Sequence, residues 1–259
     1  MKRVFSMLAG FCLLVLLGGC GPSAEQISTM TASAWTPTSP PTNTPVPTNT
    51  PLPTETPAPT AKPPFLFRDD FDGQLADGWV WLGEDTTHWS LAEVPGFMRI
   101  ITQGTNIGSD AEPINFLVHA APAGDFEIET YVQFEPTTNF QFAGLLIYEG
   151  QGQALGFGRA FAQCNFPPCK GNALYFDNPT QQNGPNFATP ITSPSEVYLR
   201  LLREGNTYTA YYSEDASNWT QIGQHTSDIT PAFVGLIASQ AYEEEKPADF
   251  DYFSIRAIP

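Results

Sequence analysis

The chain has 259 residues, with 27 acidic and 11 basic side chains and a formal net charge of −16 at pH 7. Such an acidic surface repels phosphate backbones, which argues against nucleic acid as a partner. It also repels anionic lipid headgroups, so we expect any attachment to a membrane to depend on a separate anchor.

The first nineteen residues, 1–19, have the layout of a secretory signal peptide. Lys2 and Arg3 give a positive start, an apolar run follows, and small residues precede Cys20. The segment 17–20, Leu-Gly-Gly-Cys, resembles the lipobox of bacterial lipoproteins. This resemblance implies cleavage before Cys20 and a diacylglycerol thioether on its sulfur.

The predicted anchor indicates where the rest of the chain is located. The apolar run of the leader is shorter than the ~20 residues that a membrane span needs. Two or more acyl chains hold a protein stably on a membrane. We therefore expect an extracytoplasmic protein, attached to the cell surface through its lipid anchor only. A plain signal peptide and an uncleaved membrane helix are the alternatives.

A linker rich in threonine and proline follows the anchor, and we assign residues 20–64 to it. From residue 36 onward it is almost all Thr and Pro, and a hexad recurs as TNTPVP, TNTPLP and TETPAP over 42–59. Proline at this density favours polyproline II and cannot bury a core, so the linker is predicted to be disordered. Fully extended at ~3.1 Å per residue, the segment 36–64 spans on the order of 90 Å. It serves as a spacer, as a glycosylated stalk, or as both.

Two of the four cysteines belong to the leader and the anchor. Cys12 leaves with the signal peptide, and Cys20 is the predicted acylation site. Cys164 and Cys169 remain, in Cys-Asn-Phe-Pro-Pro-Cys. Disulfides persist outside the cytoplasm, so we predict a loop disulfide between these two residues. Metal binding is the alternative, although no nearby His or Cys completes the four ligands of a zinc site.

The segment 65–259 is long enough for one hydrophobic core, and its pattern is typical of short strands. Over 126–134, apolar and polar residues alternate with period two, so one face of this strand is expected to pack in the core. The other face carries Glu127, Glu129, Tyr131 and Gln133.

Further strands are predicted where β-branched and aromatic residues lie between turn signals. Gly205-Asn206 is a predicted hairpin turn between two of them. Helical periodicity does not extend over ten residues anywhere in this segment, so we predict an all-β sandwich or barrel. The further strands are expected at 97–102, 144–149, 155–161, 173–177, 197–203, 207–213, 219–223, 233–239 and 250–257.

Several runs carry a resemblance to a known family. The run YLRLLREGNTYTAYYSEDASNWTQIG at 198–223 has the form of two joined hairpins, and DDFD, FEIETYVQF, AGLLIY and ADFDYFSI accompany it. Together they resemble concanavalin A-like (laminin G-like) β-sandwich domains, which occur as carboxy-terminal modules of β-xylosidases and as stand-alone modules. The resemblance covers 65–259 and implies an antiparallel jelly-roll sandwich. It specifies function poorly, because this fold hosts lectins, glycosidases and interaction modules.

Glycoside hydrolysis requires two placed carboxyl groups, and Glu127 and Glu129 are the nearest candidates. Some glucanases of this fold carry Glu-x-Asp-x-x-Glu on one strand, but Tyr131 and Val132 stand here where the third acid is expected. The two glutamates are more simply the polar face of a half-exposed strand. We therefore assign no catalytic residue and favour a non-catalytic domain.

Sugar recognition needs an aromatic platform beside hydrogen-bonding groups. Tyr131 shares its strand face with two glutamates and a glutamine, which meets this requirement. Tyr148 and Tyr175 lie on other predicted strands and are further candidates. The alternative for each of these rings is a role in the core or in a cross-strand pair.

Candidate metal ligands are few. His88, His119 and His225 lie far apart and lack the spacing of metal ligands. The opening and closing segments each contain Asp-Phe-Asp, and pairing of the first and last strands would gather these carboxylates around a structural calcium ion. Solvated acids at strand ends are the simpler alternative, and no cofactor is assigned. The carboxylates concerned are Asp70, Asp72, Asp249 and Asp251.

The sequence thus favours a surface-displayed, non-catalytic binding domain, with glycan as the ligand class. A glycosidase that uses Glu127 and Glu129 is one alternative. A structural or protein-interaction module of the cell envelope is the other.

Overall fold

A computed structural model of the chain describes residues 63–258, apart from 109–110, 165–168, 180–185 and 194. The predicted signal peptide, the acylation site at Cys20 and the Thr/Pro-rich linker up to residue 62 lie outside the described residues. Within the described part, no helix has the length and apolar character to cross a membrane.

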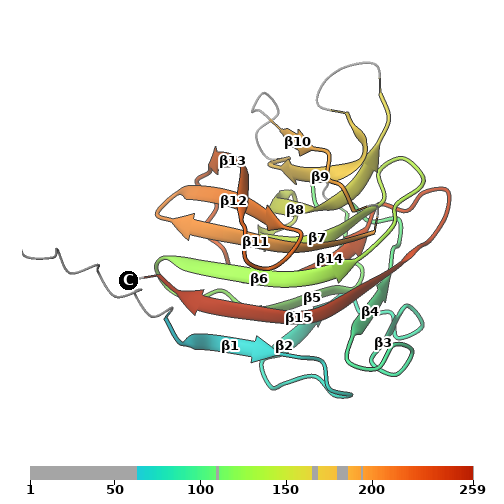
Figure 1. Cartoon of the computed structure of the whole chain (residues 1–259). Helices are drawn as coiled ribbons and strands as arrows, with labels where there is room; N and C mark the ends of the chain where they lie inside the picture. Colours follow the sequence, from blue (N-terminus) through green and yellow to red (C-terminus); the bar gives the residue numbers. More distant parts are fainter. Residues whose placement is uncertain (1–62, 109–110, 165–168, 180–185, 194, 259) are drawn as a thin grey trace, which may run out of the picture. The chain divides into compact units, whose positions relative to one another are not determined.

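Two antiparallel sheets form the domain, and they lie face to face (Figure 1). The predicted all-β sandwich is therefore confirmed. Sheet A has the order β13 (Thr220–Thr226), β12 (Thr207–Ser213), β11 (Glu196–Glu204), β6 (Phe126–Gln133), β15 (Pro247–Ala257), β4 (Met98–Ile101) and β3 (Trp89–Ser90), with β1 (Phe65–Asp69) also paired to β15. Sheet B has the order β10 (Phe187–Thr189), β9 (Gly171–Asp177), β8 (Gln153–Ala162), β7 (Phe142–Gly150), β14 (Phe233–Ser239), β5 (Phe116–Ala120) and β2 (Trp79–Leu82).

Strand β6 shows how the sequence pattern specifies the core. Phe126, Ile128 and Val132 are fully buried between the sheets, whereas Tyr131 and Gln133 on the other face are half-buried. The predicted alternation is confirmed. Burial of each large apolar side chain contributes about 1.5–3 kcal/mol, so this strand holds sheet A firmly against sheet B.

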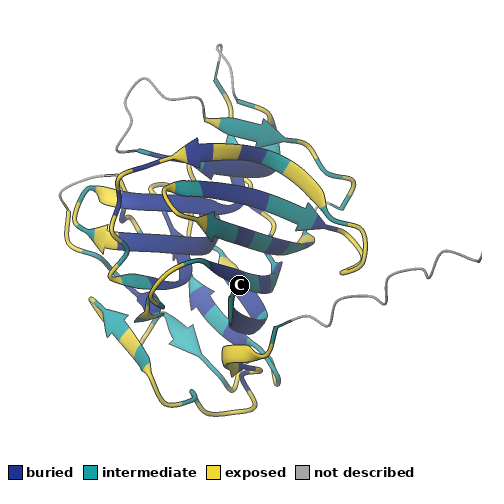
Figure 2. Cartoon of the chain, turned by 90° about the vertical axis from the view of Figure 1, so that its left-hand side faces the viewer, coloured by how far each residue is buried: buried dark blue, intermediate teal, exposed yellow. Residues whose placement is uncertain are grey.

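Sheet B is buried on both faces, as the burial colours in Figure 2 show for its central strands. A second apolar cluster covers its outer face, where Ile107 packs beside Phe142 and Leu146. Gly156 makes room for this cover, because a Cβ atom there would lie 2.5 Å from Cδ1 of Ile107. Burial on both faces explains why β7 is a continuous apolar run with no alternation.

The first and last strands pair as expected, with Asp69 of β1 opposite Phe253 of β15. The hairpin at Gly205-Asn206 is also confirmed, and Gly205 has a φ of 58°, which favours glycine. Five strands were not predicted: β1, β2, β3, β5 and β10. They have two to five residues each, too few to show a period.

Candidate functional site

The predicted sugar-binding strand face lies on the outside of sheet A. Its side chains stand in rows across three neighbouring strands. Tyr131 of β6 is flanked by Tyr198 of β11 and Tyr252 of β15, and Glu129 lies opposite Arg200. Glu127, Glu129, Tyr131 and Gln133 thus share one surface, as the sequence predicted.

The two glutamates of this face bond to their own neighbours. Arg200 donates from Nη2 to Oε2 of Glu129 at 2.6 Å, and its Nε lies 3.4 Å from Oε2 of Glu127. Tyr252 donates its hydroxyl to the other oxygen of Glu129 at 2.9 Å. The three charged side chains are only 11–17% exposed. One guanidinium therefore contacts both carboxylates of the candidate catalytic pair, which supports a structural role for them.

The Tyr131 hydroxyl is also hydrogen-bonded within the protein. Its hydroxyl donates to Oε2 of Glu196 at 2.7 Å and accepts a weak bond from Gln133 at 3.4 Å. Its ring centroid lies 4.6 Å from that of Tyr198. Burial, and then the bond to Glu196, raise the pKa of Tyr131 to about 12. The hydroxyl that a sugar would use is already bonded within the protein.

A pocket of about 570 Å³ opens on the other side of the sandwich, beside sheet B. Phe233 and Tyr148 face each other on β14 and β7, and Trp81 comes from β2. Glu112 and Gln151 add a carboxylate and an amide from loops. The full lining is Trp81, Leu82, Gly83, Glu112, Pro113, Tyr148, Gln151 and Phe233.

The chemistry of this pocket suits a sugar better than the sheet A face does. Burial, and then the charge of Glu112, raise the pKa of Tyr148. A tyrosine hydroxyl can both donate and accept a hydrogen bond. A larger pocket of about 660 Å³ beside Trp89 has Asp72 as its one charged side chain and offers fewer hydrogen-bonding side chains. Of the residues that the sequence indicated for sugar binding, only Tyr148 lines the 570 Å³ pocket, which we call the Tyr148 pocket.

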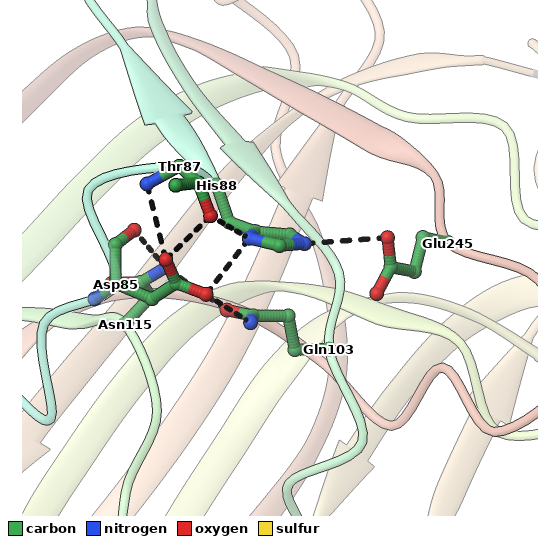
Figure 3. Close-up of polar contacts among 6 residues, drawn as sticks. All are labelled: Asp85, Thr87, His88, Gln103, Asn115 and Glu245. Atoms are coloured by element: carbon green, nitrogen blue, oxygen red, sulfur yellow. Dashed lines mark hydrogen bonds and ion pairs between the residues drawn. The ribbon is translucent and has the colours of Figure 1, made fainter.

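A polar cluster around Asn115 (Figure 3) bonds to Gly83, which lines the Tyr148 pocket. Buried Asn115 donates its backbone N–H to the carbonyl of Gly83 at 2.9 Å. Its side chain accepts from the backbone N–H of Asp85 at 2.7 Å and donates to Oε1 of Gln103 at 2.9 Å. Asn115 has a φ of 50°, a conformation that asparagine tolerates better than most residues. The Gly83–Asp85 segment is therefore fixed from inside the protein.

His88 joins this cluster to a second loop (Figure 3). Its Nδ1 lies 2.8 Å from Oδ2 of Asp85, and its Nε2 lies 3.3 Å from Oε2 of Glu245. Hydrogen bonds from Thr87 hold the pKa of Asp85 below its usual value, with smaller effects from Gln103 and His88. No pattern in the sequence indicates this contact, because His88 and Glu245 are 157 residues apart.

Tyr175 and the cysteine pair lie together at the start of β9. The Tyr175 hydroxyl donates to the carbonyl of Gly171 at 2.9 Å and accepts from the backbone N–H of Lys170 at 2.8 Å, which indicates a structural role. The Cα atoms of Cys164 and Cys169 are 5.6 Å apart, a separation that a disulfide spans, and their sulfurs are joined. Formation of this disulfide in the cell stays a prediction.

The four aspartates considered for calcium have different surroundings. Asp249 accepts two bonds from Arg99, at 2.7 and 2.8 Å. Asp70 pairs with Arg68, and burial, followed by the charge of Asp70, raises the pKa of Asp251. Within the described part of the chain, no three His, Cys, Asp or Glu residues are grouped so as to hold a metal ion. Calcium binding at Asp70, Asp72, Asp249 and Asp251 stays an untested prediction.

The two packed antiparallel sheets define a β-sandwich of the concanavalin A-like class. Residues 68–256 match the family described as the beta xylosidase C-terminal concanavalin A-like domain. The chain belongs to this family, as the resemblance of its sequence runs predicted.

Three of the similar proteins are longer than this chain. A xylan 1,3-beta-xylosidase of a Vibrio species is 23% identical over 179 residues, which are 63% of this chain and 32% of that protein. The GH43 protein BlXynB of Bacillus licheniformis is 20% identical with a TM-score of 0.62, over 74% of this chain and 39% of that one. The xylan beta-1,4-xylosidase of Bacillus halodurans is 23% identical with a TM-score of 0.60, over 78% and 41%. The chain thus spans less than half of each relative, and the structural likeness shows the fold alone.

Proposed function

We propose that this chain is a surface lipoprotein that displays a non-catalytic, carbohydrate-binding β-sandwich. The Leu-Gly-Gly-Cys segment ending at Cys20 supports the anchor, and the Thr/Pro-rich linker supports display away from the membrane. Membership of a family named for β-xylosidases supports a role with carbohydrate.

The Tyr148 pocket is the observation that carries the binding proposal. A sugar ring has apolar C–H faces and a rim of hydroxyls, so it needs aromatic surface beside donors and acceptors. Tyr148 and Phe233 supply the aromatic surface, and Glu112 and Gln151 supply an acceptor and an amide. A volume of about 570 Å³ is within the usual range for small-molecule pockets.

The contacts of Glu127 and Glu129 support a non-catalytic role. A general acid at neutral pH is usually a carboxyl group whose pKa is raised by apolar surroundings or by a nearby negative charge. Both glutamates instead contact the Arg200 guanidinium, so neither stands in the surroundings that a general acid needs.

Binding to xylan by the full-length protein in detergent tests the proposal, because two similar proteins are named for action on xylan. We expect saturable binding to β-1,3-xylan, β-1,4-xylan or another neutral polysaccharide of a broad panel, without release of sugar. Phe233→Ala is expected to weaken binding about tenfold, and Tyr131→Ala on sheet A is the matched aromatic control. If the protein binds no polysaccharide of the panel, the proposal is contradicted. Release of sugar that Glu129→Gln abolishes would favour the glycosidase alternative.

The anchor has its own test. Cells that express the chain are labelled with a radioactive fatty acid, and we expect the label to follow the protein to the membrane fraction. Cys20→Ala is expected to abolish the label and release the protein. Label retained in Cys20→Ala would place the acyl group elsewhere and refute the predicted lipobox.

A further inference from the structure

Two exposed aromatic side chains meet at the end of the sandwich where β15 begins. Phe140 precedes β7 and Tyr242 precedes β15, and these residues are 58% and 56% exposed. Their ring centroids lie 6.3 Å apart in an edge-to-face arrangement. The fold therefore brings two loops that are distant in sequence together around one aromatic pair.

Backbone strain accompanies this pair. Phe140 has a φ of 76°, and Gln240, two residues before Tyr242, has a φ of 62°. Residues other than glycine rarely adopt this conformation, and for a bulky ring it is unfavourable. Such strain persists where the surroundings enforce it, and it is concentrated at functional sites. Here it holds large rings out in solvent, where they contribute little to the core.

Hydrogen bonds hold both loops in place. The backbone N–H of Phe140 donates to the carbonyl of Phe161 at 2.8 Å. Buried Gln141 donates to the carbonyl of Glu244 at 2.6 Å and accepts from the backbone N–H of Thr137 at 2.7 Å. The rings are thus presented by ordered loops, which lowers the entropy cost of binding a ligand.

The size of the pair identifies the kind of ligand that it fits. A stable protein interface buries about 800 Å² on each partner, with several apolar anchors. Among the described residues, the other exposed large apolar side chains are Phe65, Leu66 and Val80, on β1 and β2. Phe65 lies opposite Arg256, near the far end of β15, roughly 30 Å away at the usual rise per residue. Two isolated rings match one or two sugar units better than a protein surface.

The charge beside the aromatic pair narrows the class of ligand further. Glu243, Glu244 and Glu245 directly follow Tyr242. Glu244 pairs with Lys246 at 2.9 Å and Glu245 lies 3.3 Å from His88, but these two carboxylates are 53% and 54% exposed and the run stays net negative. Carboxylates accept hydrogen bonds from sugar hydroxyls and repel uronate or sulfate groups. The ligand is therefore expected to be uncharged.

We propose that Phe140 and Tyr242 form a second contact for a neutral glycan chain, separate from the Tyr148 pocket. This inference rests on the proposed function, because both contacts bind the same polymer. A polymer that reaches both contacts gains affinity through effective concentration, whereas a short oligosaccharide occupies one of them.

Affinity as a function of chain length tests the inference. The full-length protein in detergent is titrated with xylotriose and with soluble β-1,4-xylan by calorimetry. We expect Phe140→Ala/Tyr242→Ala to weaken binding of the polymer at least tenfold and to leave the affinity for xylotriose within twofold. Leu66→Ala, an equally exposed apolar side chain on β1, is the control and is expected to change neither. Polygalacturonate is expected not to bind.

Three outcomes would overturn the inference. If the double variant binds the polymer as tightly as the unaltered protein while Phe233→Ala binds it weakly, the second contact is wrong and the proposed function stands. If no neutral polysaccharide of the panel binds the unaltered protein, both are wrong. If the double variant loses a cross-linked envelope protein and keeps its affinity for xylan, the pair is a protein contact. The double variant is checked for folding by thermal unfolding. If it does not fold, the single variants Phe140→Ala and Tyr242→Ala are tested in its place.

Discussion

The outer face of sheet A is polar and its groups bond one another, whereas the outer face of sheet B is apolar and a loop partly covers it. On sheet A, Arg200 and Tyr252 engage Glu129. On sheet B, Ile107 packs in the space left by Gly156, and a pocket remains at Tyr148. The sequence indicated the outer face of sheet A for sugar binding, but the hydrogen-bonding groups of that face are already bonded to one another.

The largest expected effect concerns the close approach of strands in sheet B. A Cβ atom on Gly158 would lie 2.2 Å from the backbone oxygen of Ala143 on the neighbouring strand. Neither backbone can move aside without breaking the pairing of β7 with β8. We expect Gly158→Ala to lower the free energy of unfolding by about 3 kcal/mol or more, as measured by chemical denaturation.

A second glycine in sheet B serves as the control for this substitution. Gly150, at the end of β7, has open space where a Cβ atom would stand. Gly150→Ala is expected to change stability by less than about 0.5 kcal/mol. Equal effects of the two substitutions would mean that the strands do not approach closely at Gly158.

On sheet A the largest effect is expected at the shared guanidinium. Arg200→Met leaves Glu127 and Glu129 facing each other without their common cation. We expect the free energy of unfolding to fall by about 2–3 kcal/mol, less than the roughly 3–5 kcal/mol of a fully buried pair, because this pair keeps some exposure. Arg200→Met/Glu129→Gln is expected to recover part of this loss. Xylan affinity is expected to stay unchanged, and a tenfold loss in a folded variant would place the sugar site on sheet A.

The sequence predicted those parts of the fold that carry a local signal. Strand β6 was predicted by its alternation, and the β11–β12 hairpin by Gly205-Asn206. Strand β5 was missed because Phe116–Ala120 is short and its first three residues are buried, so it shows no alternation. The family resemblance supplied the sandwich topology, which these local signals leave undetermined.

The candidate site was much harder to predict than the fold. Tyr148 was a candidate from its strand, but Trp81, Glu112 and Phe233 reach the same pocket from distant parts of the chain. No spacing in the sequence indicates that these residues line one pocket. Conversely, Arg200 contacts the glutamates of β6 from the neighbouring strand. This contact can be inferred only when the register of β11 against β6 is known.

A half-buried carboxylate, Asp177 at the end of β9, gives sheet B a pH dependence. Burial raises the pKa of Asp177 to about 6, against about 3.9 in an unfolded chain. The folded state therefore holds its proton more tightly, so stability falls as pH rises from about 4 to 6. We expect Asp177→Asn to stabilise the protein by about 2 kcal/mol at pH 7.5 and little at pH 4. Exposed Asp77→Asn is the control, and a gain for Asp177→Asn that is equal at both pH values would contradict burial as its cause.

The smallest changes in stability are expected when a single hydroxyl is removed from each face. These two substitutions compare the roles of the two faces most directly. Tyr131→Phe loses the bond to Glu196 on sheet A, so we expect about 0.5–1 kcal/mol of destabilisation and unchanged xylan affinity. Tyr148→Phe keeps the ring packed against Phe116 and removes a pocket donor. We expect its stability to change by less than about 0.5 kcal/mol and its xylan affinity to fall about fivefold. The two changes are chemically identical, so calorimetry with xylan separates a hydroxyl that serves the fold from one that serves the ligand. The reverse pattern, with affinity lost only in Tyr131→Phe, would return the binding site to sheet A.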